Sequence, residues 1–401
     1  MSPAAFAAQM AGFGPAPARV AVAVSGGPHS LALAILARAW ARSAGVELVA
    51  LIADHGLRPE SAAEAARACT MLAGMPCRIL SLGLAPGGAL QERARDARLA
   101  ALLAACEATA SHWLLLGHHR MDQAETVLLR AARGSGTFGL AGMPAMRQVP
   151  GVWLLRPLLD TPPAALEAVC AAAGLAPIRD PSNLDGRFAR IRARLSLADP
   201  GGEGPRVAAL VAAARGFAQR RIAAERAMLE RLPALRPDGT VLLDRVALGR
   251  DGIASILLGR LIRWVGGRLH TPATAEVAAL LDAGQGTLGG AWWRRDGWLV
   301  REPAGVAPHI PADAGAWWDG RFHLRHGWPG CQLGALGGTQ PRQASLPALW
   351  RDGKLLAAPH LEVGPSVPEL TFRALGGPID AVFQPLPKIR HSPGANVTYV
   401  S

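Results

Sequence analysis

A short polar segment of the chain carries two histidines followed by two carboxylates. His118, Asp122 and Glu125 are separated by four and three residues, so on a helix they project from one face. Carboxylate oxygens are ligands that Mg²⁺ prefers, and a bound ion can also contact nucleotide phosphates. We therefore predict that Asp122 and Glu125 hold Mg²⁺ and that His118 is a phosphate-binding or acid–base group. The alternative is an ordinary helix start, where both carboxylates favour the positive end of the helix dipole.

A second candidate site is the segment Ser25-Gly26-Gly27-Pro28-His29-Ser30, which follows an apolar run and precedes a helical pattern. A turn of small residues at a helix N-terminus presents backbone N–H groups and the helix dipole to a phosphate. Glycines let the phosphate approach closely, and proline fits a first helical turn. We predict that these residues bind a pyrophosphate group. An ordinary strand-to-helix turn is the alternative.

Two other nucleotide-binding motifs do not apply. The phosphate loop G-x-x-x-x-G-K-[ST] is excluded, because no lysine precedes Lys354. The run Gly134-Ser135-Gly136-Thr137-Phe138-Gly139 matches the dinucleotide fingerprint G-x-G-x-x-G. It follows a helical pattern instead of a strand, so the context that gives the fingerprint its meaning is missing. We interpret it as a structured loop.

The segment from Arg19 to Asp160 must position these groups, and short apolar runs alternate there with longer helical patterns. Such alternation is typical of βαβ units and predicts an α/β fold with a doubly wound parallel sheet. Ligands of such sheets bind at the carboxyl ends of the strands. The predicted strands are Val20–Val24, Leu48–Ala53, Arg78–Leu82, Trp113–Leu116 and Val152–Leu155. The predicted helices are Ser30–Arg42, Glu60–Leu72, Leu90–Ala108 and Asp122–Ala132.

The remainder of the chain predicts two further domains. The stretch Asp199-Pro200-Gly201-Gly202 marks a boundary, so residues 1–200 form the first domain. Residues 201–302 predict a mostly helical domain that ends in a β-hairpin at Leu288–Arg301, with helices at Arg206–Arg231 and Ile253–Val265. From Pro303 onward the composition turns rich in Gly, Pro and Trp. Residues 303–401 therefore predict a small mixed C-terminal domain or a loosely built tail.

The charge balance favours a polyanionic partner. The 401 residues carry 42 Lys+Arg against 30 Asp+Glu, a formal net charge of +12. All of these basic residues except Lys354 and Lys388 are arginine. The guanidinium group binds phosphate through two hydrogen bonds and stacks on bases, so such an excess fits a nucleic acid. The alternative is a GC-rich genome that replaces lysine by arginine throughout.

Cysteine usage and hydropathy narrow the class further. The five cysteines are scattered and contain no C-x-x-C, which excludes a disulfide framework, a thiolate zinc site and the usual cysteine-held iron–sulfur cluster. No apolar run reaches the length of about 18 residues that a membrane-spanning helix needs. We therefore expect a cytoplasmic protein with no membrane partner.

Taken in chain order, the motifs resemble the tRNA(Ile)-lysidine synthetase family of PP-loop ATP pyrophosphatases. The resemblance covers residues 20 to 195. It rests on the Ser25–Ser30 turn, on Asp54-His55-Gly56-Leu57-Arg58 after the second strand, and on the segment His118–Thr126. Further matches are Gln91, Ala94, Arg95 and Arg98, the glycine-rich segment Arg133–Met143, and Asp180-x-Ser182-Asn183 with Phe188-x-Arg190 and Arg194.

The resemblance implies a ligase. ATP adenylylates the C2 carbonyl of the wobble cytidine in an isoleucine tRNA with a CAU anticodon, and L-lysine then displaces AMP. It implies ATP and Mg²⁺, with Asp54 and His55 joining the Ser25–Ser30 turn at the nucleotide. It also implies that Arg190 and Arg194 contact the adenylate or anticodon phosphates and that residues 201–302 contact tRNA. The oligomeric state stays open, a homodimer included.

Two positions depart from the family pattern. The family usually has Asp where His29 stands, and commonly a pair of Asp where Met121 and Asp122 stand. A neutral imidazole replaces a Mg²⁺-binding carboxylate poorly. Two alternatives therefore remain: a non-catalytic or impaired tRNA-binding relative, and another PP-loop tRNA-modifying enzyme. Thiolases of the latter group generally need a paired cysteine or cluster motif, which these five cysteines do not supply.

Overall fold

The computed structural model of the chain describes residues 1–56, 59–83, 90–149, 151–179, 187, 189–361, 363 and 370–372. The described residues divide into two compact units, one within residues 1–222 and one within residues 223–372. The division into domains 1–200, 201–302 and 303–401 stays a prediction. In the described part of the chain, no helix is both long and apolar enough to cross a membrane.

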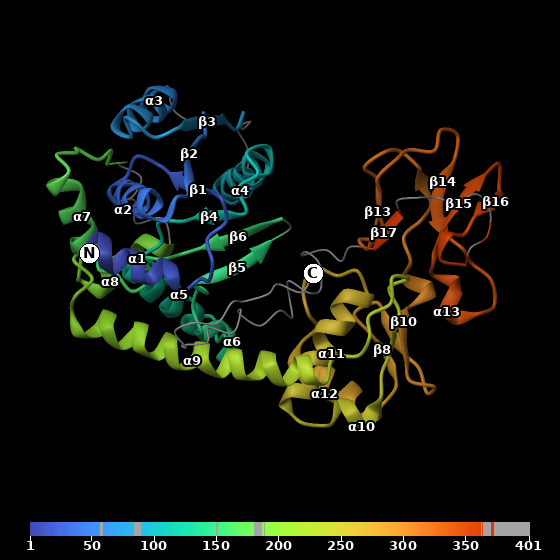
Figure 1. The fold of residues 1–401 in the computed structure, drawn as a ribbon. Helices are drawn as coiled ribbons and strands as arrows, with labels where there is room; N and C mark the ends of the chain where they lie inside the picture. Colours follow the sequence, from blue (N-terminus) through green and yellow to red (C-terminus); the bar gives the residue numbers. More distant parts are fainter. Residues whose placement is uncertain are drawn as a thin grey trace. The chain divides into compact units, whose positions relative to one another are not determined.

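A six-stranded sheet in the order β3-β2-β1-β4-β6-β5 forms the centre of the first unit (Figure 1). Its strands are β1 (Arg19–Val24), β2 (Glu47–Asp54), β3 (Cys77–Ser81), β4 (Trp113–Leu115), β5 (Met146–Val149) and β6 (Val152–Leu155). All neighbours are parallel except β5, which runs antiparallel to β6 at one edge. The predicted α/β fold with a doubly wound parallel sheet is therefore confirmed. The sequence pattern does not predict β5, because polar Arg147 and Gln148 fill its middle.

Helices cover both faces of this sheet, and they are α1 (Pro3–Ala11), α2 (Pro28–Ala44), α3 (Ser61–Met71), α4 (Leu90–Ala108) and α7 (Pro163–Ala172). Val20, Val22 and Val24 of β1 belong to a core that contains residues of α1, α2, α3 and α7. Ala21 of β1 belongs to the core on the opposite face, which contains residues of α4. A strand buried on both faces in this way is typical of the middle of a parallel sheet.

Three further helices pack together beside the sheet: α5 (Arg120–Ala132), α8 (Ala189–Leu197) and α9 (Pro205–Glu230). Met121 of α5 forms a small core with Leu197 of α8 and Val207 of α9. Met121 is 1% exposed, and a carboxylate buried in such a core would be costly without a partner. Packing therefore explains the methionine at this position.

The second unit combines short helices with three antiparallel sheets, ordered β7-β10-β9-β8, β11-β14-β15-β16 and β12-β13-β17. Its helices are α10 (Arg245–Leu248), α11 (Gly252–Val265), α12 (Thr274–Ala283), α13 (Pro341–Ala344), η2 (Pro303–Gly305) and η3 (Pro359–Leu361). Its strands are β7 (Val241–Leu242), β8 (Gly286–Leu288), β9 (Ala291–Trp293), β10 (Trp298–Arg301), β11 (Ile310–Pro311), β12 (Trp317–Trp318), β13 (Phe322–Leu324), β14 (Gln332–Ala335), β15 (Pro347–Arg351), β16 (Lys354–Ala357) and β17 (Leu370–Phe372). The predicted hairpin is confirmed as β9 and β10.

Candidate nucleotide-binding site

The loops after β1 and β4 leave the sheet where its strand order reverses. β1 has β2 on one side and β4 on the other, and ligands of doubly wound sheets bind at such a point. The two loops are in contact, since a Cβ added to Gly117 would lie 3.2 Å from the Cα atom of Ser30. The fold therefore brings the two predicted segments together.

Gly26 determines the shape of the turn after β1. Its φ of +80° lies in the left-handed region, which L side chains rarely adopt. A Cβ on Gly26 would lie 2.6 Å from Ile178 Cδ1. The Ile178 N–H also donates to the Gly26 carbonyl at 2.9 Å. The segment after α7 thus packs directly on the turn and leaves room for glycine alone.

The hydroxyls of Ser25 and Ser30 hold this turn together. The Ser25 N–H donates to Ser30 Oγ at 3.1 Å, and the two hydroxyl oxygens lie 3.2 Å apart. The Ser30 hydroxyl also donates to the Gly27 carbonyl at 3.0 Å. Gly27 is the N-cap of α2 and Pro28 is its first residue, so the cap has no side chain to satisfy the first N–H groups. A helix end of this kind binds anions through its N–H groups and its dipole.

Asp54 shapes the turn that leads from β2 to α3. Its carboxylate accepts hydrogen bonds from the Ser61 hydroxyl at 2.6 Å and from the Gly56 N–H at 2.9 Å. These two hydrogen bonds hold the pKa of Asp54 below its ordinary value, and the bond from Ser61 has the larger effect. His55 follows and is half-buried. The contacts of Asp54 support the loop, and ATP binding by Asp54 and His55 stays a prediction.

Three neutral histidines line the site between the turn and α5. The rings of His29 and His119 lie 4.0 Å apart at 67°. Burial lowers the pKa of His29 to about 3, with His119 adding to the effect, and burial lowers the pKa of His118 to about 4. His29 Nε2, His118 Nδ1 and His119 Nδ1 are buried without a hydrogen-bond partner in the described part of the chain. These nitrogens are available to a ligand.

The prediction that His118 shares a helical face with the two carboxylates is wrong. α5 begins at Arg120 and His119 is its N-cap in extended conformation, so His118 lies in the preceding loop. His118 nevertheless remains near Asp122, whose charge opposes the lowering of its pKa. At pH 7 His118 is a neutral hydrogen-bonding group, and the charge of a bound phosphate would favour its protonation.

Asp122 caps the first turn of α5. Its Oδ2 accepts from the His119 N–H at 3.0 Å and lies 3.4 Å from His119 Nε2. Burial raises the pKa of Asp122, but His119, His118 and Arg194 together bring it below its ordinary value. Asp122 is therefore ionised at neutral pH. Its Oδ1 lies 3.9 Å from Arg194, so this oxygen has the weaker partner.

Glu125 forms the closest ion pair of the site. Arg194 Nε donates to Glu125 Oε1 at 2.6 Å, and the Glu125 side chain is 1% exposed. Burial raises the pKa of Glu125 although Arg194 opposes the shift. Among the described residues, no group of three or more His, Cys, Asp and Glu is arranged to hold a metal ion. Mg²⁺ commonly takes one or two carboxylates with phosphates and water, so Asp122 Oδ1 fits this role and Glu125 fits it less well.

Several arginines lie on elements next to the predicted site. Arg190 is exposed and lies one turn before Arg194 on α8. Arg95 and Arg98 belong to α4, Arg147 belongs to β5, and Arg156 directly follows β6. Sequence reasoning did not select Arg147 or Arg156. Arg156 directly follows a predicted strand, so the rule that ligands bind at the carboxyl ends of strands could have found it.

Side chains of α5 also hold the glycine-rich loop that follows it and contains α6 (Thr137–Leu140). Arg130 Nη1 donates to the carbonyls of Gly139 and Gly142 at 2.8 and 2.9 Å. The Gln123 amide donates to the Met143 carbonyl at 3.0 Å and accepts from its N–H at 2.7 Å. The run that matches the dinucleotide fingerprint therefore follows a helix, and its interpretation as a structured loop is confirmed.

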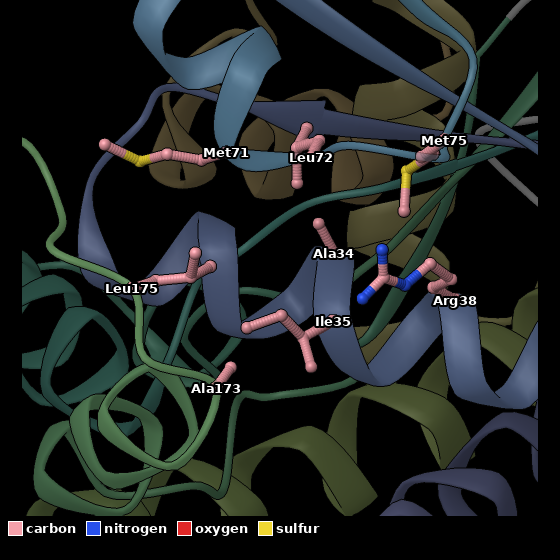
Figure 2. Close-up of a pocket in the computed structure, with 8 residues that line it drawn as sticks. All are labelled: Ala34, Ile35, Arg38, Met71, Leu72, Met75, Ala173 and Leu175. Carbon is pink, nitrogen blue, oxygen red and sulfur yellow. The ribbon is translucent and has the colours of Figure 1, made fainter.

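A separate pocket lies between α2, α3 and the end of α7, as Figure 2 shows. Its lining is apolar except for Arg38, whose Nη1 donates to the Ala73 carbonyl at 3.0 Å. The lining residues are Ala34, Ile35, Arg38, Met71, Leu72, Met75, Ala173 and Leu175. No residue predicted for the nucleotide site is among them, so this pocket is distinct from that site.

Several residues that carry the family resemblance lie outside the described residues. They are Leu57, Arg58, the side chain of Gln91, Asp180, Ser182, Asn183 and Phe188. Their parts in the site stay predictions.

Comparison with known proteins agrees with this geometry. A family model described as a PP-loop domain matches residues 5–200. Fold and site thus define an ATP-binding protein of the PP-loop class. The tRNA(Ile)-lysidine synthase of Methylobacterium nodulans is 42% identical over 267 residues, which cover 64% of this chain and 78% of that protein. The enzyme of Ruegeria pomeroyi is 37% identical over 323 residues, 77% of each chain. The chain belongs to the tRNA(Ile)-lysidine synthase family.

The extent of the match varies among relatives. The tRNA(Ile)-lysidine synthase of Novosphingobium aromaticivorans is 48% identical over 181 residues, which cover 44% of this chain and 55% of that protein. The chain thus spans about half the length of that relative.

Proposed function

We propose that the chain is an ATP-dependent ligase that joins L-lysine to C2 of the wobble cytidine in an isoleucine tRNA with a CAU anticodon. The C2 carbonyl oxygen attacks the α-phosphate of ATP, and pyrophosphate leaves. An amine of L-lysine then attacks C2, loses a proton, and displaces AMP together with that oxygen. The observation that carries the proposal is a glycine turn, Ser25 to Ser30, that leaves the N-terminus of α2 without a side-chain cap, in a chain of the tRNA(Ile)-lysidine synthase family.

The turn and α5 supply the nucleotide end of the site. The first N–H groups of α2 and the hydroxyl of Ser25 are suited to the negative charge that develops on the departing pyrophosphate. His118 and His119 add neutral ring nitrogens beside it. Mg²⁺, when bound, would neutralise phosphate charge, and Asp122 with Glu125 are the residues that would hold it.

Two arginines of α8 are suited to bind the RNA. Glu125 orients Arg194 through the bond at 2.6 Å, while the Arg194 side chain is 37% exposed. Its remaining N–H groups can therefore donate to a phosphate of the adenylate or the anticodon. Arg190 adds a second guanidinium one turn away. The proposal implies ATP, L-lysine and tRNA as partners, a cytoplasmic location and no membrane.

His29 supports an alternative in which the chain binds tRNA but does not complete the ligation. The family usually has a carboxylate at this position, whereas the His29 imidazole is neutral with a pKa of about 3 because of its burial. A neutral imidazole adds no negative charge for Mg²⁺. The alternative predicts binding of tRNA without pyrophosphate release.

Incubation of the full chain with CAU-anticodon tRNA transcript, ATP, Mg²⁺ and labelled lysine tests the proposal. We expect label in the tRNA and release of one pyrophosphate and one AMP per lysine incorporated. A folded sample that binds tRNA but incorporates no lysine would contradict it. Rescue of that sample by His29→Asp would assign the defect to the histidine, and failure of the rescue would favour a binding protein without ligase activity.

A further inference from the structure

Four arginines outside the nucleotide-binding turn form what we call the arginine cluster: Arg95, Arg98, Arg147 and Arg156. α4 runs from β3 to the parallel strand β4, so its N-terminal half, which carries Arg95 and Arg98, lies toward the carboxyl ends of the strands. The cluster therefore approaches the edge of the sheet at which the nucleotide site lies.

Strand pairing places the other two arginines at the same edge. Arg156 follows β6 directly, and the Leu116 N–H donates to the Leu155 carbonyl at 2.9 Å. Arg156 is thus level with the loop that carries His118. Arg147 of β5 is paired with Leu154 of β6, and Leu154 belongs to the core that contains residues of α4. Directly paired residues point to the same face, so Arg147 lies on the α4 face of the sheet.

The cluster runs from a buried inner arginine to exposed outer ones. Arg156 is 8% exposed, and its Nε has no hydrogen-bond partner in the described part of the chain. Its Nη1 donates to the Pro144 carbonyl at 2.9 Å, which holds the guanidinium in place. Arg95, Arg98 and Arg147 are exposed. A buried N–H without a partner is costly, and an anion would satisfy it.

The charges of the cluster repel one another. Burial and then repulsion by Arg147 and Arg95 lower the pKa of Arg156 to about 10. Partial burial of the Arg95 guanidinium, together with repulsion by Arg190 and Arg147, likewise lowers the pKa of Arg95, and Asp96 opposes this shift. An excess of positive charge of this kind is relieved when an anion binds.

We propose that the arginine cluster binds phosphodiester groups of the RNA substrate, with Arg156 at the inner end of the path and the three exposed arginines along it. The proposal rests on the proposed function, because it names the part of the RNA that the site takes. In the proposed function, the triphosphate of ATP binds at the N-terminus of α2. This helix covers the face of the sheet opposite to α4. A path of several guanidinium groups fits a chain of phosphates better than the single phosphate of an adenylate.

Charge reversal at the exposed positions tests the proposal. Arg95→Glu and Arg147→Glu should each weaken binding of the tRNA transcript about tenfold or more. Each should also reduce the slope of the logarithm of the binding constant against the logarithm of the salt concentration by about 1. Fluorescence anisotropy between 50 and 200 mM salt measures both effects. Arg67→Glu on α3 is the matched control, since Arg67 is exposed and lies on the other face of the sheet. We expect this control to bind tRNA as the wild type does.

A variant of Arg156 tests whether the planar guanidinium matters in addition to its charge. Arg156→Lys keeps the charge but loses the planar fork, so it should weaken tRNA binding with little change in salt dependence. Circular dichroism confirms that each variant is folded. Calorimetric titration with ATP should give wild-type affinity for Arg95→Glu and Arg147→Glu.

The outcomes distinguish this inference from the function itself. If the wild type forms lysidine and both reversals bind tRNA normally, the cluster is not an RNA site. If the reversals weaken ATP binding and spare tRNA binding, the cluster serves the nucleotide and the proposal is overturned. If the wild type forms no lysidine but loses tRNA affinity on charge reversal, the function fails and the RNA site stands.

Discussion

Arg194 connects the two helices that carry the acidic and basic groups of the site. It bonds to Glu125 at 2.6 Å and lies 3.9 Å from Asp122. Because Glu125 is 1% exposed, the negative charge would be costly to bury without this partner. The same ion pair therefore links α5 to α8 and fixes the orientation of the Arg194 guanidinium.

Replacing Glu125 by Gln should lower the free energy of unfolding by about 1 to 3 kcal/mol, because the shape is kept but a buried ion pair is lost. Urea unfolding measures the change. Glu167→Gln is the matched control, because the Glu167 side chain is 46% exposed and that of its partner Arg179 is 70% exposed. An exposed pair contributes about 0.5 kcal/mol. Equal losses in the two variants would contradict the structural role of Glu125.

The buried histidines make stability depend on pH. Burial lowers the pKa of His29 to about 3 and that of His118 to about 4, both from 6.5. As the pH falls below 6.5, these histidines become protonated in the unfolded chain but stay neutral in the folded protein. The free energy of unfolding therefore decreases on acidification. Each histidine should remove about 2 kcal/mol between pH 7 and pH 5.

A substitution isolates the contribution of one histidine. In His29→Gln, the loss of unfolding free energy between pH 7 and pH 5 should be smaller than in the wild type by about 2 kcal/mol. Urea unfolding at the two pH values gives this difference. His112→Gln, at an exposed position in the same unit, serves as the control and should keep the wild-type loss. An identical pH response of His29→Gln and wild type would refute the assignment.

At the scale of elements, the connection from β1 to α2 depends on a glycine that is both left-handed and closely packed. Gly26 and Gly45 have φ values of +80° and +66°. A Cβ on Gly26 would lie 2.6 Å from Ile178, whereas a Cβ on Gly45 would have no described atom within 4 Å beyond its chain neighbours. A side chain at Gly45 would therefore introduce backbone strain alone, whereas a side chain at Gly26 would introduce both strain and a steric clash.

Gly45→Ala should cost about 1 kcal/mol through strain alone, while Gly26→Ala should cost about 2 to 4 kcal/mol and abolish ATP binding. Thermal unfolding and an ATP titration measure the two effects. Gly26→Ala with wild-type affinity for ATP would show that the turn does not hold the nucleotide.

The elements that sequence reasoning predicted are those with long, regular patterns. β1 alternates valines over its whole length, and α2 carries a proline at its start and Gly45 at its end, so local signals are sufficient. β5 and the position of His118 were not predictable in this way. The middle of β5 is polar, and His119 extends the backbone before α5 although the spacing alone allows a helix. Arg147 and Arg156 come to the carboxyl end of β6 only through strand pairing, which is a long-range contact.

At the scale of the whole molecule, one buried carboxylate links the three sheets of the second unit. Asp319 Oδ2 accepts from Arg301 of β10 at 2.9 Å and from Arg321, beside β13, at 2.8 Å. Arg321 also donates to the Ser345 carbonyl before β15 at 3.0 Å. Burial raises the pKa of Asp319, but Arg301 and Arg321 bring it below its ordinary value. The carboxylate is therefore ionised at neutral pH.

Asp319→Asn should lower the free energy of unfolding by about 3 to 5 kcal/mol, because it leaves two buried guanidinium groups without a counter-charge. Asp296→Asn is the matched control, since Asp296 also pairs with an arginine but is 49% exposed. This control should change stability by less than about 1 kcal/mol. Calorimetric unfolding compares the two, and similar melting temperatures would rule out a linking role for Asp319.

The predominance of arginine has a chemical consequence for the proposed ligation. An adenylylated cytidine is an electrophile that any nearby uncharged amine can attack, and lysine side chains are the usual source of such amines in proteins. Residues 1–353 contain no lysine, and a guanidinium stays protonated and does not act as a nucleophile at neutral pH. The basic side chains of this part of the protein are thus inert toward the activated base. The basic residues around the proposed intermediate therefore offer no side-chain amine that would compete with free lysine for it.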